Sequence, residues 1–328
     1  MTKAFDTCRE IFAKNRTFFI TTHVNPDPDA IGSELALARF LKDRSKVVSI
    51  LNHSSTPTNC LFLDPERMIT QFDPAQHTAV LSDAEVIVVV DANQPERLHS
   101  LSPFILKSNA TKICIDHHLE RKAFADLYVI DEDAAATGEI LFDLFAHLDR
   151  NSVTQDIATA LYAAIMTDTG SFRFPKTDAS LHRMVAHLIE RGADPVKIYH
   201  EVYEQGTVHR LLLLGNALST LRLFHNGKVA SMFVTRAMFS STETTEEDTE
   251  NFVTYALNIA GVQIGLMFTE LPGGVKISFR SRGDIPVNKL AQEFGGNGHK
   301  NAAGARTEGK QLDAVINEVI ARSNTYLT

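Results

Sequence analysis

The chain has 328 residues, of which 44% are hydrophobic and 22% charged, so it is long enough for two globular domains and wholesale disorder is excluded. Its net charge of −8 would repel a long polyanion, which favours a small substrate over long nucleic acid. No apolar run approaches ~18 residues, the N-terminus has no signal-peptide core, and an odd three cysteines argue against a disulfide framework; we therefore expect a cytoplasmic protein with no membrane partner.

The first part of the chain alternates short apolar runs with helical patterns. Runs such as VIVVV, apolar on both faces, are typical of a parallel sheet covered by helices on both sides. The pattern predicts an α/β domain over residues 1–190. The expected strands are 17–22, 47–51, 85–90 and 112–115, and the expected helices are 30–41, 138–148 and 157–166.

After residue 180 the pattern becomes helical as far as residue 224, and we interpret residues 191–226 as a helical connector. The Asn226-Gly227 turn signal then precedes a smaller α+β domain over 227–328. Its expected strands are KVASMFVT, GVQIGLMFTEL and GVKISFRSR, and its expected helices are 246–258, 287–294 and 312–326. The apolar stretch LLLLGNALSTLRLF could bury a face in a homodimer, but packing in a core explains it equally well.

Residues that can bind metal follow three of the predicted strands. In open α/β sheets, ligands bind beyond the carboxyl ends of the strands, so these segments could meet in one crevice. Oxygen and imidazole ligands without cysteine favour Mn²⁺ or Mg²⁺ over a structural zinc. The residues concerned are His23, Asp27 and Asp29 after the first strand, Asp91 after VIVVV, Asp116-His117-His118 after KICI, and Asp168 at a helix end.

Each of these segments also has an ordinary structural interpretation. Asp27-Pro28-Asp29 is common turn material, and Asp91 or Asp168 could each terminate an element. The adjacent His117 and His118 are harder to explain in this way. The joint pattern favours a metal site because four separate segments would all have to coincide by chance.

The motifs THVNPDPDAIGS, VVVDANQPERL, CIDHH and MTDTGSFRF resemble the DHH phosphoesterase superfamily. The stretch KISFRSRGDIPVNKLAQEFGGNGHKNAAGA looks like the DHH-associated C-terminal domain, so the resemblance spans nearly the whole chain. The superfamily includes RecJ-type exonucleases, manganese-dependent pyrophosphatases and phosphodiesterases of short or cyclic nucleotides. The closest resemblance is to bifunctional oligoribonuclease/pAp phosphatases.

The resemblance implies a role for each matching residue. His23 and Asp27 would hold one Mn²⁺, and Asp29, His117 and Asp168 would hold a second, with Asp91 between them; Mg²⁺ or Co²⁺ are possible substitutes. His118 would face the substrate phosphate and Asp116 would orient the histidines. Arg280, Asn297, Gly298 and His299 would contact the substrate, and Arg173 is a further phosphate-binding candidate, although a surface salt bridge explains it nearly as well.

Two positions depart from the family pattern. Pro28 replaces the usual glycine between the first two carboxylates, so the backbone there cannot be left-handed. Asn297 interrupts the glycines before His299, and asparagine is the residue most tolerant of positive φ after glycine. Both changes bear on substrate preference more than on metal binding.

Residues 295–304 read as a Gly/Ala-rich turn beside a cationic strand. Small residues let backbone N–H groups approach a phosphate or base closely. Between Lys276 and Lys310 there are seven Lys or Arg against three Asp or Glu. Arg280 and Arg282, two apart on an extended strand, would share a face and could clamp a phosphate; a solvated cationic strand is the ordinary alternative.

The leading hypothesis is therefore two-metal hydrolysis of short oligoribonucleotides to mononucleotides and of pAp to AMP. The N-terminal domain would hold the metals and the C-terminal domain the remote end of the substrate, across a cleft. An alternative within enzymes is a hydrolase of linear pApA or pGpG, or of cyclic dinucleotides. A nucleotide-binding regulator without catalysis is the alternative of another class, and such a protein would usually lack one of the ligands.

Overall fold

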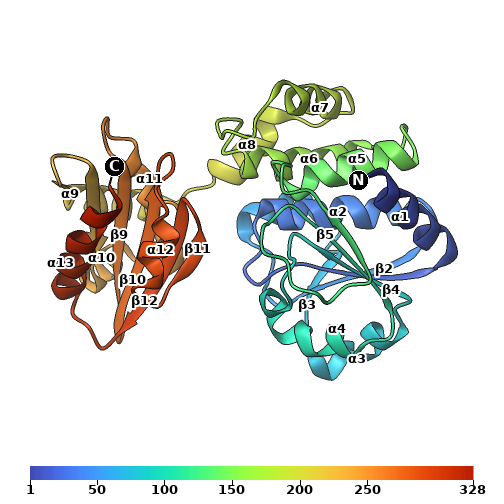
Figure 1. Cartoon of the computed structure of the whole chain (residues 1–328), viewed down its shortest axis with the longest axis horizontal. Coiled ribbons are helices and arrows are strands. Elements are labelled where there is room, and N and C mark those ends of the chain that lie inside the picture. Colours follow the sequence, from blue (N-terminus) through green and yellow to red (C-terminus); the bar gives the residue numbers. More distant parts are fainter. Residues whose placement is uncertain (328) are drawn as a thin grey trace. The chain divides into compact units, whose positions relative to one another are not determined.

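The computed structural model describes residues 1–327, apart from the side chain of His299. The chain divides into two compact units, Met1–Gln205 and Gly206–Thr328. Each unit contains a six-stranded sheet with helices on both faces (Figure 1). Residues 191–226, expected as a helical connector, are divided between the two units.

The N-terminal unit is built on a parallel sheet with strand order β3-β2-β1-β4-β5-β6. This order reverses direction between β1 and β4, the topological switch point of a doubly wound sheet. The strands are β1 (Thr17–Thr21), β2 (Val47–Asn52), β3 (Ile69–Gln71), β4 (Val86–Val90), β5 (Thr111–Asp116) and β6 (Leu127–Ile130).

Helices cover both faces of this sheet, which explains why its central strands are apolar on both sides. In β4, Val86, Val88 and Val90 pack in the core on one face, while Ile87 and Val89 pack in the core on the other. The helices α1, α2, α5 and α6 lie on the first face and α3 and α4 on the second (Figure 1). The helices of this unit are α1 (Thr2–Lys14), α2 (Pro28–Lys42), α3 (Pro74–Asp83), α4 (Ser102–Lys107), α5 (Thr137–Leu148), α6 (Gln155–Asp168), α7 (Ala179–Glu190) and α8 (Pro195–Tyr203), with short 3₁₀ segments η1 (Thr58–Leu63) and η2 (Pro95–Leu101).

The C-terminal unit has a mixed sheet with strand order β11-β12-β10-β9-β8-β7, in which β8 and β9 are parallel and the other pairs antiparallel. Leu266 and Phe268 of β9 face one core, and Met267 faces the other. Its strands are β7 (Arg222–Phe224), β8 (Val229–Val234), β9 (Ile264–Leu271), β10 (Gly274–Ser281), β11 (Asn297–His299) and β12 (Ala302–Glu308). Its helices are α9 (Val208–Ser219), α10 (Arg236–Thr242), α11 (Val253–Leu257), α12 (Val287–Gln292) and α13 (Leu312–Ser323), with 3₁₀ segments η3 (Glu246–Thr249) and η4 (Asn324–Tyr326).

The predicted fold class is confirmed, but three local predictions in this unit are wrong. The helical pattern over 209–224 ends at Ser219, and Arg222–Phe224 forms a strand because it pairs with β8. The helix predicted over 246–258 is broken near Asn251, whose φ of 63° is left-handed. Residues 295–304 are not a simple turn, because β11 and β12 pair there as an antiparallel hairpin.

No helix among the described residues is long and apolar enough to cross a membrane.

Candidate metal centre

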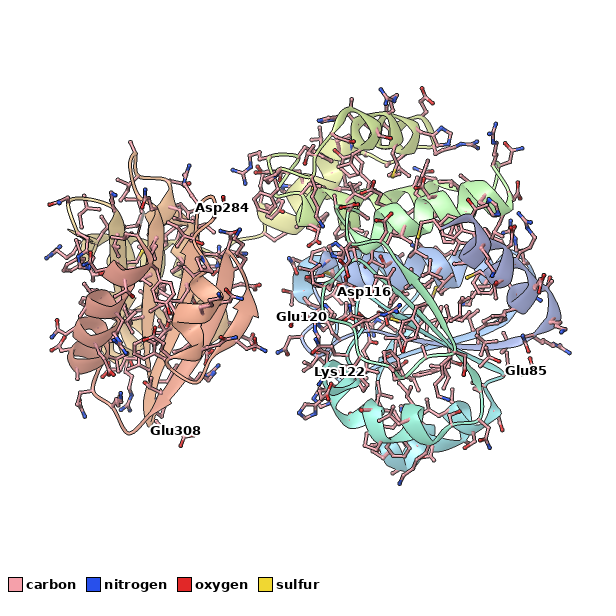
Figure 2. All side chains as sticks on the ribbon, viewed as in Figure 1. Glu85, Asp116, Glu120, Lys122, Asp284 and Glu308 are labelled. Carbon is pink, nitrogen blue, oxygen red and sulfur yellow. The ribbon has the colours of Figure 1, made fainter. Side chains whose placement is uncertain are left out.

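The carboxyl ends of the parallel strands gather the predicted metal-binding residues at one edge of the N-terminal sheet. His23 follows β1, Asp91 follows β4, and His117 follows β5. Because β1, β4 and β5 are parallel neighbours, these residues leave the sheet at the same edge. In Figure 2, Glu85, which precedes β4, and Asp116, which ends β5, lie well apart along the N-terminal unit, consistent with the amino and carboxyl ends of the strands.

Two helices bring carboxylates to the same edge. Asp27 is the N-cap of α2, where one carboxylate oxygen accepts a hydrogen bond from Ala30 N at 3.0 Å. Pro28 occupies the first turn of that helix, a position that suits its fixed φ, and Asp29 follows. The helix α6 ends with Asp168. Asp27 therefore does cap a helix, as its ordinary structural interpretation expected. Its second carboxylate oxygen is not used in this cap and could bind a metal ion.

The structure brings all of these residues together. One ligand atom from each member of a group lies within 4.8 Å of the others in three overlapping groups of described residues. The groups are His23, Asp27 and Asp91; Asp29, His117 and Asp168; and Asp91, His117 and His118. Asp91 and His117 each belong to two groups, so the cluster is continuous.

The two histidine rings are held so that Nε2 points into the cluster. His23 Nδ1 lies 2.9 Å from the carbonyl of Val24, and His117 Nδ1 lies 3.3 Å from the carbonyl of Ala134. A carbonyl partner requires Nδ1 to carry a proton, so Nε2 is the nitrogen that would offer its lone pair to a metal ion. His23 Nε2 then lies 3.2 Å from Asp91 Oδ2, and His117 Nε2 lies 3.1 Å from Asp168 Oδ2, 3.7 Å from Asp91 Oδ1 and 3.8 Å from Asp29 Oδ2.

Burial and mutual repulsion make this cluster electrostatically unfavourable on its own. Burial raises the pKa of Asp91 to about 7, and the charge of Asp27 adds to this shift. Burial also raises the pKa of Asp29 well above its usual range, with repulsion from Asp91 and Asp168 adding to it. Burial opposes protonation of His117, but the neighbouring carboxylates outweigh it and raise its pKa to about 10.

These observations fit divalent cations. The donor set is carboxylate oxygen and imidazole nitrogen, and His117 Nε2 is buried and lies 3.1 Å from Asp168 Oδ2 without the geometry of a hydrogen bond. Cations here would keep the carboxylates ionised and give that nitrogen a partner. His23, Asp27 and Asp91 would hold one ion, and Asp29, His117 and Asp168 would hold the other, next to Asp91.

His118 belongs to the same edge but has a different partner. Its Nδ1 lies 2.7 Å from Asp116 Oδ1 and 3.6 Å from Asp91 Oδ1. Asp116 is fully buried, and its other oxygen has no hydrogen-bond partner among the described residues. Asp116 is therefore placed to fix the orientation of the His118 ring.

Sequence reasoning missed Thr137 and Gly138 at the start of α5. Thr137 Oγ1 donates to Asp91 Oδ1 at 2.9 Å, while the N–H groups of Thr137 and Gly138 donate to the two oxygens of Asp29 at 2.8 and 3.0 Å. A Cβ at Gly138 would lie 2.7 Å from Ala164 Cβ, so a larger residue would disturb this approach. The signal was present as Thr-Gly opening a helical pattern, since helix N-termini bind anions.

A second missed feature is a buried polar chain behind the cluster. Glu34 of α2 accepts a hydrogen bond from Asn52 Nδ2 at 2.8 Å, and Asn52 Oδ1 accepts from Thr22 N at 3.3 Å. Thr22 Oγ1 in turn donates to the carbonyl of Val90 at 2.8 Å. This chain therefore links the residues that directly precede His23 and Asp91.

Several residues around the cluster have left-handed backbone. Asp91 has φ 56° and Asn25 has φ 54°. After Asp168, the consecutive residues Gly170, Ser171 and Phe172 have φ of 57°, 58° and 64°. Non-glycine residues with positive φ are uncommon and concentrate at functional sites.

The predicted substrate contacts lie in two places. Arg173 follows the Asp168 turn, where its Nε donates to the carbonyl of Gly170, and it forms no ion pair with a described residue. Arg280 lies in β10 of the other unit, in register with Ala302 of β12, which is in register with His299 of β11. The side chain of His299 lies outside the described part of the chain.

The hairpin itself explains its glycines. Gly298 has φ 146°, and a Cβ there would lie 2.5 Å from Ala302 O. Asn297 is exposed, accepts a hydrogen bond from Gly298 N through its own Oδ1 at 2.8 Å, and does not have positive φ. Arg282 lies just past the end of β10 and donates to the carbonyl of Leu257, so its guanidinium already has a partner; the predicted phosphate clamp of Arg280 and Arg282 stays a prediction.

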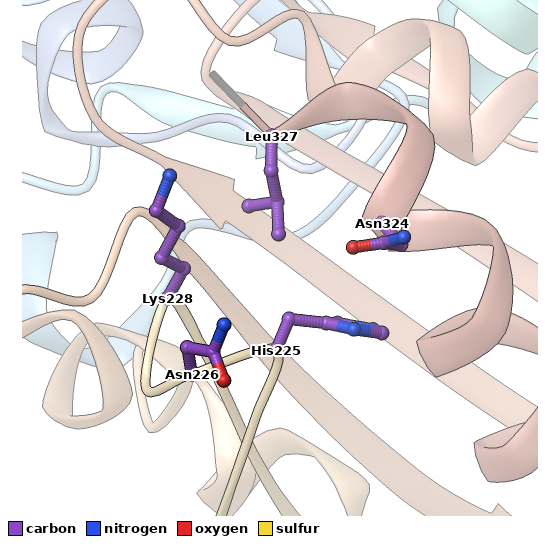
Figure 3. Close-up of a pocket in the computed structure, with 5 residues that line it drawn as sticks. All are labelled: His225, Asn226, Lys228, Asn324 and Leu327. Carbon is purple, nitrogen blue, oxygen red and sulfur yellow. The ribbon is translucent and has the colours of Figure 1, made fainter.

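The C-terminal unit also has an open hollow of about 410 Å³, which contains none of the predicted site residues (Figure 3). It is lined by His225, Asn226, Lys228, Asn324 and Leu327. His225 Nε2 donates to the carbonyl of Ile320 at 2.8 Å, so this side chain ties the turn between β7 and β8 to α13.

A doubly wound sheet with a carboxylate and imidazole cluster at its switch point defines a metal-dependent hydrolase of the phosphoesterase class. The family model described as "DHH family, N-terminal domain" matches residues 17–165, and the DHHA1 domain matches residues 226–324. The chain belongs to the DHH family.

Its relatives are similar over most of their length. A protein of Thermus thermophilus called bifunctional oligoribonuclease and PAP phosphatase NrnA is 32% identical, over 94% of this chain and 90% of the relative. The Bacillus subtilis protein of the same name is 26% identical over 88% of each chain. The crystal structure of an exopolyphosphatase-related protein from Bacteroides fragilis matches with a TM-score of 0.95 at 28% identity, covering 99% of this chain and 97% of that one.

Proposed function

We propose that this protein hydrolyses short oligoribonucleotides to mononucleotides and pAp to AMP, with two divalent cations bound at the carboxyl edge of its N-terminal sheet. The two relatives named as oligoribonuclease and PAP phosphatase support the substrate class, because the similarity extends over both units.

One observation carries the proposal: six carboxylate and imidazole side chains from separate segments form two triads around Asp91 and His117. When bound, a pair of divalent cations activates water and offsets charge on a phosphate under attack. The chain supplies the rest. Thr137 and Gly138 hold Asp29, and carbonyl groups hold His23 and His117, so that the ligand atoms stay in place during the reaction.

His118 is the residue that faces the substrate phosphate in this proposal. Its Nδ1–H bonds to buried Asp116, which leaves Nε2 to donate or accept a proton at a phosphate oxygen. Asp116 is a positioning residue, because it sets the ring of His118.

Arg280, Asn297, Gly298 and His299 bind the terminal phosphate or base of the substrate. Arg280 is half-buried, and burial lowers its pKa; its guanidinium donates to the Phe279 carbonyl at 3.0 Å, which leaves other donors for an anion. Arg173, exposed beside the Asp168 turn, is a second contact for the scissile phosphate.

The physiological ion in this proposal is Mn²⁺. Imidazole ligands mixed with carboxylates suit Mn²⁺ better than Mg²⁺, which prefers an all-oxygen shell and keeps its waters.

A substrate panel tests the proposal. The purified protein should be assayed with pAp, di- to pentanucleotides and a 24-nucleotide RNA, with Mn²⁺ and with Mg²⁺. Dinucleotides and pAp should be turned over faster than the long RNA, and Mn²⁺ should support higher kcat/KM than Mg²⁺. Equal turnover of the long RNA would contradict the substrate class, and pGpG cleaved with no turnover of pAp would favour a second-messenger hydrolase.

A further inference from the structure

Two imidazoles at the metal-binding edge have no part in the proposed metal site. His53 directly follows β2, and His99 lies within η2, the 3₁₀ segment that follows Asp91. Their ring centroids are 4.1 Å apart, with an angle of 37° between the planes. The two residues come from different segments and form one aromatic pair.

The pair lies beside the loop that carries His23. The parallel register pairs Ile20 of β1 with Ile50 of β2, which brings His23 and His53 to corresponding positions three residues further on. Adjacent strands are ~4.8 Å apart, so the two segments leave the sheet next to each other.

Hydrogen bonds fasten the segments of the pair to that loop. Ser54, next to His53, accepts a hydrogen bond from Asn25 N at 2.9 Å. On the other side, Val24 N donates to the carbonyl of Arg97 in η2 at 2.7 Å. The loop that carries His23 is therefore held between the segment of His53 and the segment of His99.

His99 has a backbone conformation that is rare for a residue with a side chain. Its φ of 48° and ψ of −114° correspond to the first central position of a type II′ turn, where glycine is normal. The imidazole is exposed and, among the described residues, contacts the ring of His53 without a hydrogen bond to offset the strain. A residue with a strained backbone and an exposed side chain, next to the proposed metal site, indicates a functional constraint.

The chemistry of the pair suits a flat, neutral ligand. His53 Nδ1 bonds with Ser100 Oγ at 2.7 Å, which fixes the ring, and its Nε2 has no partner among the described residues. Burial and the neighbouring His99 lower the pKa of His53, so its ring is neutral at neutral pH. A neutral aromatic face with one hydrogen-bonding nitrogen is suited to a nucleobase, since bases stack on aromatic side chains in a sequence-tolerant way.

We propose that His53 and His99 form a base-binding subsite for the nucleoside beyond the scissile phosphate, the one that a dinucleotide has and pAp lacks. The inference rests on the proposed function. The terminal phosphate or base of the substrate was assigned above to residues of the C-terminal unit, so a base bound at the metal-binding edge of the N-terminal unit belongs to the nucleoside on the other side of the scissile phosphate.

The test compares pApA with pAp in His99→Gly, His53→Ala and the double variant. Loss of one base-stacking partner should lower the ratio of kcat/KM for pApA to that for pAp by about tenfold. His99→Gly should keep or raise the Tm, because glycine adopts this backbone without strain. His187→Ala, which removes a histidine on α7, is the matched control and should leave the ratio unchanged.

A substrate change separates stacking from a general structural effect. A dinucleotide whose second nucleoside is abasic should be a poorer substrate for the wild type by about the same factor, and the variants should show no further loss on it, as a double-mutant cycle requires. An unchanged pApA to pAp ratio in the double variant, or an equal loss on the abasic substrate, would overturn the subsite.

Measurements of binding affinity test the subsite independently of catalytic turnover. If the wild type turns over neither compound, the proposed function fails, and calorimetric Kd values for pApA and pAp then decide. A preference for pApA that is lost in the double variant supports the subsite, and no preference in the wild type overturns it.

Discussion

The two units handle charge in opposite ways. At the carboxyl edge of the N-terminal sheet, Asp29 and Asp91 are 0% and 1% exposed and lie among other carboxylates. In the C-terminal unit, several of the charges near the hairpin lie in ion pairs. Lys276 and Arg306 share Glu246, and Lys300 pairs with Asp284.

In the proposed function, this difference would separate a site for ions from a site for a substrate. Buried carboxylates that lie close together can stay ionised only if a bound group supplies positive charge. Paired surface cations contribute little by themselves. The surplus of four cations counted between Lys276 and Lys310 therefore overstates the anion-binding capacity. Arg280, Arg282 and Lys289 have no ion pair with a described residue, and of these three only Arg280 lies within a strand of the sheet.

The largest expected effect tests the buried side of the comparison. Asp91→Asn should lower kcat/KM at least ~1,000-fold, more than the 10–100-fold typical of residues behind the ligands, because Asp91 belongs to two of the three groups. The Tm should not fall, since the change removes a buried charge whose pKa is raised to about 7. Circular dichroism and turnover measure both, and retained activity in a folded variant would break the two-ion assignment.

Adding a metal ion tests whether a cation balances the buried carboxylates of the N-terminal cluster. A cation at 100 times its Kd stabilises the folded state by about 2.7 kcal/mol. We expect Mn²⁺ to raise the Tm of the chelator-treated protein by several degrees. Asp91→Asn should respond much less, and an equal rise in that variant would assign the stabilisation to another place.

Thr137→Val also tests the buried cluster of the N-terminal unit, because it removes one hydrogen bond to Asp91. The loss should lower kcat/KM by roughly 10–100-fold and weaken Mn²⁺ activation, as for other groups that orient metal ligands. Thr159→Val is the matched control, because the Thr159 hydroxyl bonds to the carbonyl of Gln155 within α6. Similar activity in the two variants would show that the Thr137 hydroxyl has no part in the site.

In the C-terminal unit, we expect substitutions of Arg280 and Arg306 to have unequal effects on KM. Arg280→Met should raise KM about tenfold, the size expected for one lost hydrogen bond to a charged group. Arg306→Met should change KM less than about twofold, because Arg306 is paired with Glu246 at the surface. Equal effects on KM would mean that general cationic charge, and not Arg280, binds the substrate.

The smallest expected effect concerns Glu34 behind the cluster. Burial raises the pKa of Glu34 well above its usual range. Its contribution to stability is therefore present at pH below its unfolded pKa of ~4.3 and is lost as pH rises through the folded pKa. Glu34→Gln should raise the Tm relative to wild type at pH 8 and change it little at pH 4, as thermal melts across pH would show; the opposite trend would contradict a buried, protonated Glu34.

Much of the candidate metal centre could be predicted from the sequence. Doubly apolar runs specify a parallel sheet covered on both faces, and the carboxyl ends of such strands meet at one edge. His23, Asp91 and His117 directly follow such runs, so their convergence follows from local pattern and general topology.

The sequence by itself determined the class of fold, the residues at the strand ends and the chemistry that such residues can perform. Tertiary structure decided which neighbours hold them. The contacts of Thr137 and Gly138 with Asp29, the pairing of β11 with β12, and the contact of His53 with His99 join residues far apart in the chain or depend on hydrogen bonds and backbone angles that no short pattern specifies. The physical reason is that hydrophobic periodicity sets each element locally, whereas side-chain partners depend on how the elements pack.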